Sequence, residues 1–343
     1  MLVNLGLTGQ DVSDELLGKQ GPFSEEFVEH DAADWSHCGR HLCVLPGEYA
    51  IANKEEYDAI GCCHLENSIA VIITCASNKA AIANVGKDGF SKVIGDMVIG
   101  IQGEGGKATR RGAPQLELFM VGGAHTEAIF SVLLTQFHES NFRFAVRLAC
   151  VGPLNEGGYH GVSTHAGKTL INGVALDLNS REVRPLEYGS WFSNEPAIAL
   201  RLARYIFNAA GNQPMVALQE ASVVIPKFQF CQLDNQAMAL LLWFSYNEPL
   251  KLWRTFYSGD SLIHEELLTQ FSSECRKALL LISRHNESVF KGKDYFIVKR
   301  QSDGSWNDKD IRILDPICDT SHPLSLLTSF SSYVSLGKQI GKS

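Results

Sequence analysis

The chain has 343 residues, of which 45% are hydrophobic and 20% charged, and its formal net charge is −8. This composition is ordinary for a globular protein, and the length allows one large domain or two modest ones. The acidic balance argues against nucleic acid or an anionic membrane as the main partner.

In chain order, alternating or β-branched patterns predict strands at residues 42–45, 48–52, 68–74, 80–84, 115–121, 142–150, 169–178, 215–218, 222–225 and 295–300. Helical spacing predicts helices at residues 11–17, 126–138, 195–210 and 264–284. The last of these strands, a turn at residues 302–304 and Trp306 are predicted to form a hairpin. Because strands and helices do not alternate strictly, the pattern favours an α+β sandwich over a doubly wound parallel sheet.

The chain divides by composition into three segments. Residues 1–36 form an acidic N-terminal extension, residues 37–315 the main α+β domain, and residues 316–343 a Ser-rich tail that we expect to be loosely attached.

The chain shows no targeting signal. Its first residues lack the basic start and long apolar run of a signal peptide, and its longest apolar run, residues 237–244, is too short to span a bilayer. The nine cysteines are scattered and odd in number, unlike a disulfide framework. We therefore expect a cytoplasmic protein, or one exported by a route that needs no signal peptide.

Two segments resemble known motifs but do not have the spacing that those motifs require. Residues 100–109 resemble a phosphate-binding loop, but Ile101 stands where the first glycine should be and Ala108 where Ser or Thr should bind magnesium. We interpret the segment as a flexible exposed loop.

Histidines and cysteines also gather in zinc-like combinations, at His37, Cys38, His41, Cys43 and residues 62–64, while His160 and His165 flank a Gly-rich loop. The spacing is not that of a zinc motif, and alternate residues of a strand point to opposite faces. We predict neither a metal site nor a cofactor.

Five stretches, in order, carry a resemblance to a known family. They are Glu-Tyr-Ala-Ile at 48–51, Gly-Cys-Cys-His-Leu-Glu-Asn-Ser at 61–68 with its apolar strand, Leu-Glu-Leu-Phe-Met-Val-Gly-Gly at 116–123, residues 170–179, and residues 292–306, which end in Asp-Gly-Ser-Trp. Together they resemble the protein N-terminal asparagine amidohydrolases, enzymes that convert an N-terminal Asn to Asp. The resemblance covers about residues 40–310.

The resemblance implies a fold and a chemistry. The Val-Gly-Gly stretch is also similar to the chemotaxis receptor deamidases, so we expect a layered α/β/β sandwich of mainly antiparallel and mixed strands with flanking helices. In these families a thiolate attacks a side-chain amide, a histidine acts as base and then as acid, and ammonia leaves as the acyl-enzyme forms. Here Ser68 stands at the cysteine position, residues 63–67 replace the family's Asp-x-Ala-Thr-Thr, and residues 81–86 lack the family's histidine.

The resemblance also selects candidate site residues. Ser68 takes the nucleophile position, His64 and His125 are candidate bases, and Glu66, Asn67, Gly122 and Gly123 are expected to line a pocket. Paired glycines after a strand allow close backbone approach or positive φ. Cys75 is seven residues from Ser68, about 20 Å or more along a strand, so it cannot simply replace Ser68. Cys62 and Cys63 are interpreted as buried thiols.

Three functions stay open. The first is an amide hydrolase that converts Asn to Asp and releases ammonia, using Ser68 and an unrecognised base. The second is a catalytically inactive homologue that binds a peptide terminus or protein partner through the retained pocket. The third is a transglutaminase-like acyl transfer at another cysteine. The acidic charge suits a basic or neutral peptide in each case.

Overall fold

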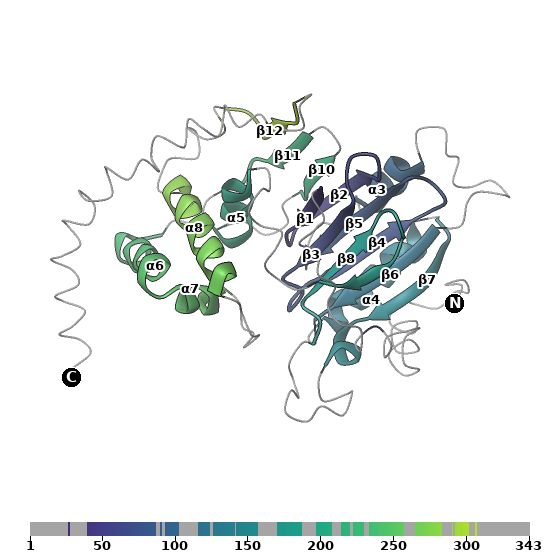
Figure 1. The fold of residues 1–343 in the computed structure, drawn as a ribbon, viewed down its shortest axis with the longest axis horizontal. Helices are drawn as coiled ribbons and strands as arrows, with labels where there is room; N and C mark the ends of the chain where they lie inside the picture. Colours follow the sequence, from purple (N-terminus) through teal and green to yellow (C-terminus); the bar gives the residue numbers. More distant parts are fainter. Residues whose placement is uncertain are drawn as a thin grey trace.

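The computed structural model describes residues 40–86, 93–102, 116–123, 126–140, 142–156, 170–186, 197–207, 214–219, 222–229, 233–256, 265–282 and 292–301, and the single residues 27, 90, 290 and 306. In this part of the chain two mixed sheets and a set of helices form an α+β fold with an α/β/β layering, as predicted (Figure 1). No helix among the described residues is both long and apolar enough to cross a membrane.

The larger sheet has eight strands. Their spatial order is β12 (Tyr295–Lys299), β11 (Ser222–Pro226), β10 (Val216–Gln219), β2 (Glu48–Asn53), β5 (Lys79–Val85), β4 (Ile69–Thr74), β6 (Leu116–Gly122) and β7 (Phe144–Cys150). Neighbours are antiparallel except for β10 with β2 and β6 with β7, which are parallel. The smaller sheet orders β1 (His41–Val44), β3 (Ala59–Cys63), β8 (Gly173–Asp177) and β9 (Val183–Pro185).

The two faces of the larger sheet pack against different layers. On β4 the residues Ile69, Val71 and Ile73 face one core, which α3 (Val93–Gln102) and α4 (Glu127–Glu139) cover. The alternate residues Ala70 and Ile72 face a second core, shared with the smaller sheet. This period-two alternation in a fully buried β-branched strand places β4 at the centre of the fold.

A group of helices extends the second core. It comprises α5 (Ile198–Phe207), α6 (Asn235–Asn247), α7 (Pro249–Phe256) and α8 (Glu265–Ile282), and it lies beside the sheets, away from α3 and α4 (Figure 1). A short 3₁₀ turn, η2 (Gly152–Asn155), follows β7. The fully buried Trp253 of α7 belongs to the second core.

Most predicted elements are confirmed with shifted ends. The strand predicted at 169–178 is confirmed over β8 and the helix predicted at 195–210 over α5; residues 169, 195, 196 and 208–210 lie outside the described residues. The predicted loop at 100–109 is wrong for residues 100–102, which form the last turn of α3; a Cβ on Gly100 would lie 2.3 Å from Ile51. The rest of that loop, and the helix predicted at 11–17, lie outside the described residues.

Six of the described elements were not predicted: the strands β3 and β9, the helices α3, α6 and α7, and the 3₁₀ turn η2. The predicted strands around Pro46–Gly47 are both present, but β1 and β2 belong to different sheets. Gly47 makes the sharp corner between them with φ +79°, a left-handed conformation that glycine adopts without steric cost. The chain therefore crosses from one layer to the other at this corner.

Candidate functional site

Ser68 lies at the entrance of β4, in a segment we name the Ser68 turn (residues 64–68). The side chain is buried, with 3% of its surface exposed, and its hydroxyl donates a hydrogen bond to the carbonyl oxygen of His64 at 3.0 Å. The hydroxyl proton is therefore directed to a backbone oxygen of the turn and not to an imidazole.

His64 begins the turn in a left-handed conformation, with φ +63°. This conformation is uncommon outside glycine, but histidine is among the residues that adopt it more often. The imidazole points into the helical group, with ring centroids 5.3 Å from Trp253 and 6.3 Å from Tyr205. Burial lowers the pKa of this imidazole well below its usual value, so the ring is neutral at physiological pH.

Asn172, just before β8, holds the middle of the turn. The backbone N–H of Leu65 donates to both the side-chain and the backbone oxygen of Asn172, at 2.8 and 3.2 Å. With its oxygen so engaged, the Asn172 amide turns its NH₂ group to the carboxylate of Glu66 and donates to it. Burial raises the pKa of Glu66, and hydrogen bonds from Asn172 and from the backbone N–H of Glu66 oppose that rise.

Gly122 and Gly123 press directly against the turn. A Cβ on Gly123 would lie 2.1 Å from the carbonyl oxygen of Glu66, and one on Gly122 would lie 2.7 Å from Ile69 and 3.2 Å from the backbone oxygen of Ser68. Only glycine allows the end of β6 to approach this closely. The close approach predicted for the pair is confirmed, while their role in lining a pocket stays a prediction.

Two buried polar side chains hold the backbone of the glycine pair by hydrogen bonds. Asn155 donates to the carbonyl oxygens of Gly122 and Ile171, both at 2.8 Å, and its own oxygen accepts from the Ile171 N–H. Thr126 donates to the carbonyl oxygen of Gly123 at 2.7 Å. Asn155 and Asn172 were not predicted, because no local pattern marks a single asparagine whose partners lie in distant segments.

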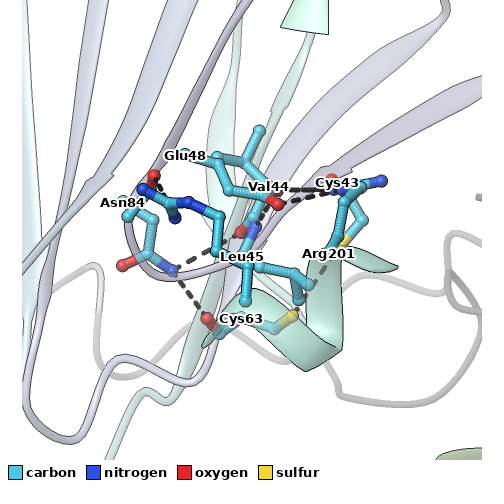
Figure 2. A network of polar contacts seen from close by, with 9 residues as sticks. Cys43, Val44, Leu45, Glu48, Cys63, Asn84 and Arg201 are labelled. Carbon is cyan, nitrogen blue, oxygen red and sulfur yellow. Dashed lines mark hydrogen bonds and ion pairs between the residues drawn. The ribbon is translucent and has the colours of Figure 1, made fainter. Parts of the chain in front are cut away.

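Asn84 occupies the strand beside Ser68. In the register of β4 and β5 it is opposite Ala70, two residues after Ser68, within the stretch that lacks the family's histidine. Its amide donates to the carbonyl oxygens of Cys63 at 2.8 Å and Val44 at 3.4 Å (Figure 2). Among the described residues its side-chain oxygen, which is buried, has no hydrogen-bond donor.

A buried ion pair adjoins Asn84 at the corner between β1 and β2. Arg201 of α5 donates from Nε and a terminal nitrogen to both oxygens of Glu48, and also to the carbonyl oxygen of Cys43 (Figure 2). The Glu48 carboxylate also accepts from the N–H of Leu45. Both side chains are essentially inaccessible, with 0% and 2% of their surface exposed. Glu48, which heads the first family-like stretch, thus ties the helical group to both sheets.

The cysteines in the described part of the chain are all buried. Burial raises the pKa of Cys150 to about 12 and raises the pKa values of Cys62 and Cys275 well above the usual value, which keeps these thiols protonated. Cys75 follows the last residue of β4, at the opposite end of the strand from Ser68, and is also buried. Cys43 and Cys63 lie with their sulfurs 3.4 Å apart, both buried.

The remaining candidate residues either lie near the surface or fall outside the described residues. Glu66 is half-buried and Asn67 exposed, so the tip of the turn reaches the surface. His125 lies outside the described residues, as do His37, Cys38, His160 and His165 of the zinc-like combinations. Within the described ranges, no group of three or more His, Cys, Asp and Glu side chains is arranged to hold a metal ion.

The chain matches a known protein family. A family model described as protein N-terminal asparagine amidohydrolase matches residues 32–308, which is most of the chain and includes every described site residue. No curated protein matches the chain.

Proposed function

The chain belongs to the protein N-terminal asparagine amidohydrolase family, and from this premise we propose that it binds a peptide or protein N-terminus at the Ser68 turn without hydrolysing it. The observation that carries the proposal is the hydrogen bond from Ser68 to the carbonyl oxygen of His64. The residue at the nucleophile position is thereby part of the turn's own scaffold.

Hydrolysis at this position would need a base beside the hydroxyl. A serine hydroxyl is far less acidic than a thiol and becomes a nucleophile only when a positioned base removes its proton. The neighbouring strand offers Asn84, and a carboxamide cannot act as that base. The imidazole of His64 packs against Trp253, while Ser68 bonds to the His64 backbone.

The framework around the turn supports retained binding. Asn172, Gly123 and Asn155 hold the turn in one conformation through hydrogen bonds and close packing. A rigid turn whose tip is accessible is suited to recognition, because little ordering is needed on binding. The cytoplasmic location expected from the sequence stays a prediction.

Ammonia release and peptide binding, measured together, test the proposal. Peptides beginning with Asn or Gln are incubated with the wild type, Ser68→Ala and Ser68→Cys, and binding of the same peptides with a C-terminal dye is followed by fluorescence anisotropy. We expect wild type and Ser68→Ala to give equal background ammonia, and the wild type to bind. Ammonia release by the wild type that Ser68→Ala abolishes would refute a purely binding role.

A serine hydrolase with His125 as base is the second candidate. It is favoured by one observation: Gly123 and Thr126, on either side of the segment that contains His125, are both buried beside the Ser68 turn. If the wild type releases ammonia, His125→Ala should abolish the release while leaving peptide binding in place.

A further inference from the structure

Glu66 differs from the ion-paired carboxylates of the described residues in the kind of partner that it has. Within the described part of the chain, ion pairs join Glu48 to Arg201, Asp58 to Arg40, Glu117 to Arg147, Glu182 to Arg184, Glu248 to Lys251, Glu274 to Lys277 and Glu56 to Arg300. Glu66 instead accepts from the neutral amide of Asn172 and from its own backbone N–H. It is partly withdrawn from water with no cation bonded to it in this part of the structure.

The carboxylate is held in place and still has hydrogen-bonding capacity. Leu65 fixes the orientation of the Asn172 amide, and Asn172 fixes Glu66, so the group is positioned before any ligand arrives. A carboxylate offers about four acceptor sites, and the two neutral donors leave capacity for a ligand. Glu66 is half-buried and the next residue, Asn67, is exposed, so a ligand can reach it from the surface.

We propose that Glu66 binds the α-ammonium group of the peptide N-terminus. This inference rests on the proposed function, because it names the group through which the Ser68 turn recognises a terminus. An ammonium donates up to three charge-assisted hydrogen bonds and supplies the positive charge that this carboxylate lacks. The family's motif has threonine at the corresponding position, so the recognition group is a feature of this chain.

The spacing fits an N-terminal residue. In such a residue the ammonium nitrogen is separated from the side-chain carbon of the Asn amide by three bonds, so the group that binds the ammonium must lie close to the nucleophile position. Glu66 and Ser68 are two residues apart in a tight turn, about 7 Å at most along the chain. A terminus held by Glu66 would therefore place its first side chain at the Ser68 end of the turn.

Three peptides that differ only in their first residue and its acetylation distinguish an α-ammonium from a lysine ammonium. The first has a free N-terminus and no lysine, the second is N-acetylated and has no lysine, and the third is N-acetylated with lysine at the first position. Each carries a C-terminal dye and is titrated with wild type, Glu66→Gln and Glu139→Gln. Glu139 is an exposed carboxylate at the end of α4 and serves as the matched control.

We expect the free-terminus peptide to bind wild type and Glu139→Gln equally, and to bind Glu66→Gln at least tenfold more weakly. The acetylated peptides should bind the wild type at least tenfold more weakly than the free peptide. Glutamine keeps an oxygen for Asn172, so the turn should persist, and a circular dichroism melt confirms that the variant is folded.

The outcomes separate the two proposals. If the wild type binds the free peptide and Glu66→Gln binds it equally well, the assignment of Glu66 is wrong while the binding function stands. If the acetylated lysine peptide binds as tightly as the free one, a side-chain ammonium is the ligand and the assignment to the terminus is wrong. If no peptide binds the wild type, both the binding function and the role of Glu66 are refuted.

Discussion

Glu48 and Glu66 are both carboxylates withdrawn from water, but of the two only Glu48 faces a cation among the described residues. At the corner between β1 and β2, Arg201 satisfies the buried carboxylate with three hydrogen bonds and an opposite charge. In the Ser68 turn, neutral amides hold Glu66 and its pKa is raised by burial. The same side chain thus serves in one region with its charge fully compensated and in the other without compensation.

The difference distinguishes a structural region from a recognition region. A buried charge that loses its partner is costly, so a compensated pair commits the fold to one arrangement. An uncompensated charge is a small cost to stability, which is tolerated where a ligand completes the interaction.

Breaking the Glu48–Arg201 pair should cause the largest loss. Arg201→Met leaves a buried carboxylate and Glu48→Gln leaves a buried guanidinium, so each should lower the free energy of unfolding by about 3–5 kcal/mol in urea denaturation. The double variant should lose less than the sum of the singles. Arg184→Gln removes the exposed pair with Glu182 and should cost at most about 1 kcal/mol. A cost below 1 kcal/mol for either single variant of the buried pair would contradict its structural role.

The strands around this pair were largely predictable, and the missing elements have physical reasons. The β-branched run of β4 and the glycine after α5 are local signals. The strand β3 was missed because Ala-Ile-Gly-Cys-Cys is short and carries a glycine. The helix α3 carries Gly95 and Gly100, which lower helix propensity, and its face is set by packing on β2 and β5. The sequence did not predict that β1 and β2 belong to different sheets, because this depends on contacts with segments far away in the chain.

Gly123→Ala should cause the next largest loss. The added Cβ would lie 2.1 Å from the Glu66 carbonyl oxygen, and this backbone atom is held by the rest of the turn. We expect a loss of about 2–3 kcal/mol in urea denaturation, because overpacking a fixed backbone forces a shift. Gly86→Ala is the matched control, since a Cβ there meets no atom within 4 Å, and should cost under about 0.5 kcal/mol. Equal costs for the two variants would show that the close approach is not needed.

A site residue could be predicted from the sequence only where a pattern in its own segment marks it. The Gly122–Gly123 pair was found because two glycines after a strand indicate a close backbone approach or a positive φ. Ser68 was found through the resemblance of its segment to a family motif. Asn172 could not be found, because it acts on Leu65, 107 residues earlier in the chain. The same holds for Asn84, whose bonds reach Val44 and Cys63.

His64 should make the fold sensitive to acid. Its pKa is lowered in the folded state, so the unfolded chain binds this proton more readily. The stability that it contributes is complete above a pH of about 6.5 and is lost as the pH falls below that value, by up to about 1.4 kcal/mol per pH unit. His64→Asn suits the left-handed backbone and cannot titrate, so its stability should fall less between pH 7 and pH 5. Urea denaturation at both pH values measures this difference.

The control for acid sensitivity is His138→Asn, which changes an exposed histidine at the end of α4. This variant should lose as much stability as the wild type between pH 7 and pH 5. If His64→Asn shows the same loss as the wild type, the His64 ring is not the source of the acid sensitivity, and its packing against Trp253 does not exclude the proton.

Glu66→Gln should cause the smallest change, and the change should be a gain. The pKa of Glu66 is raised in the fold, so its stabilising contribution is complete below the pKa of the unfolded chain and is lost as the pH rises through the folded pKa. At pH 7 the ionised group therefore opposes folding, and a neutral glutamine that keeps its bond to Asn172 should raise the free energy of unfolding by up to about 1 kcal/mol. Urea denaturation at pH 7, with Glu139→Gln as control, measures the change. A gain in stability together with a loss of peptide affinity would show that this carboxylate is kept for a ligand, whereas a loss of both would make Glu66 part of the framework, like Glu48.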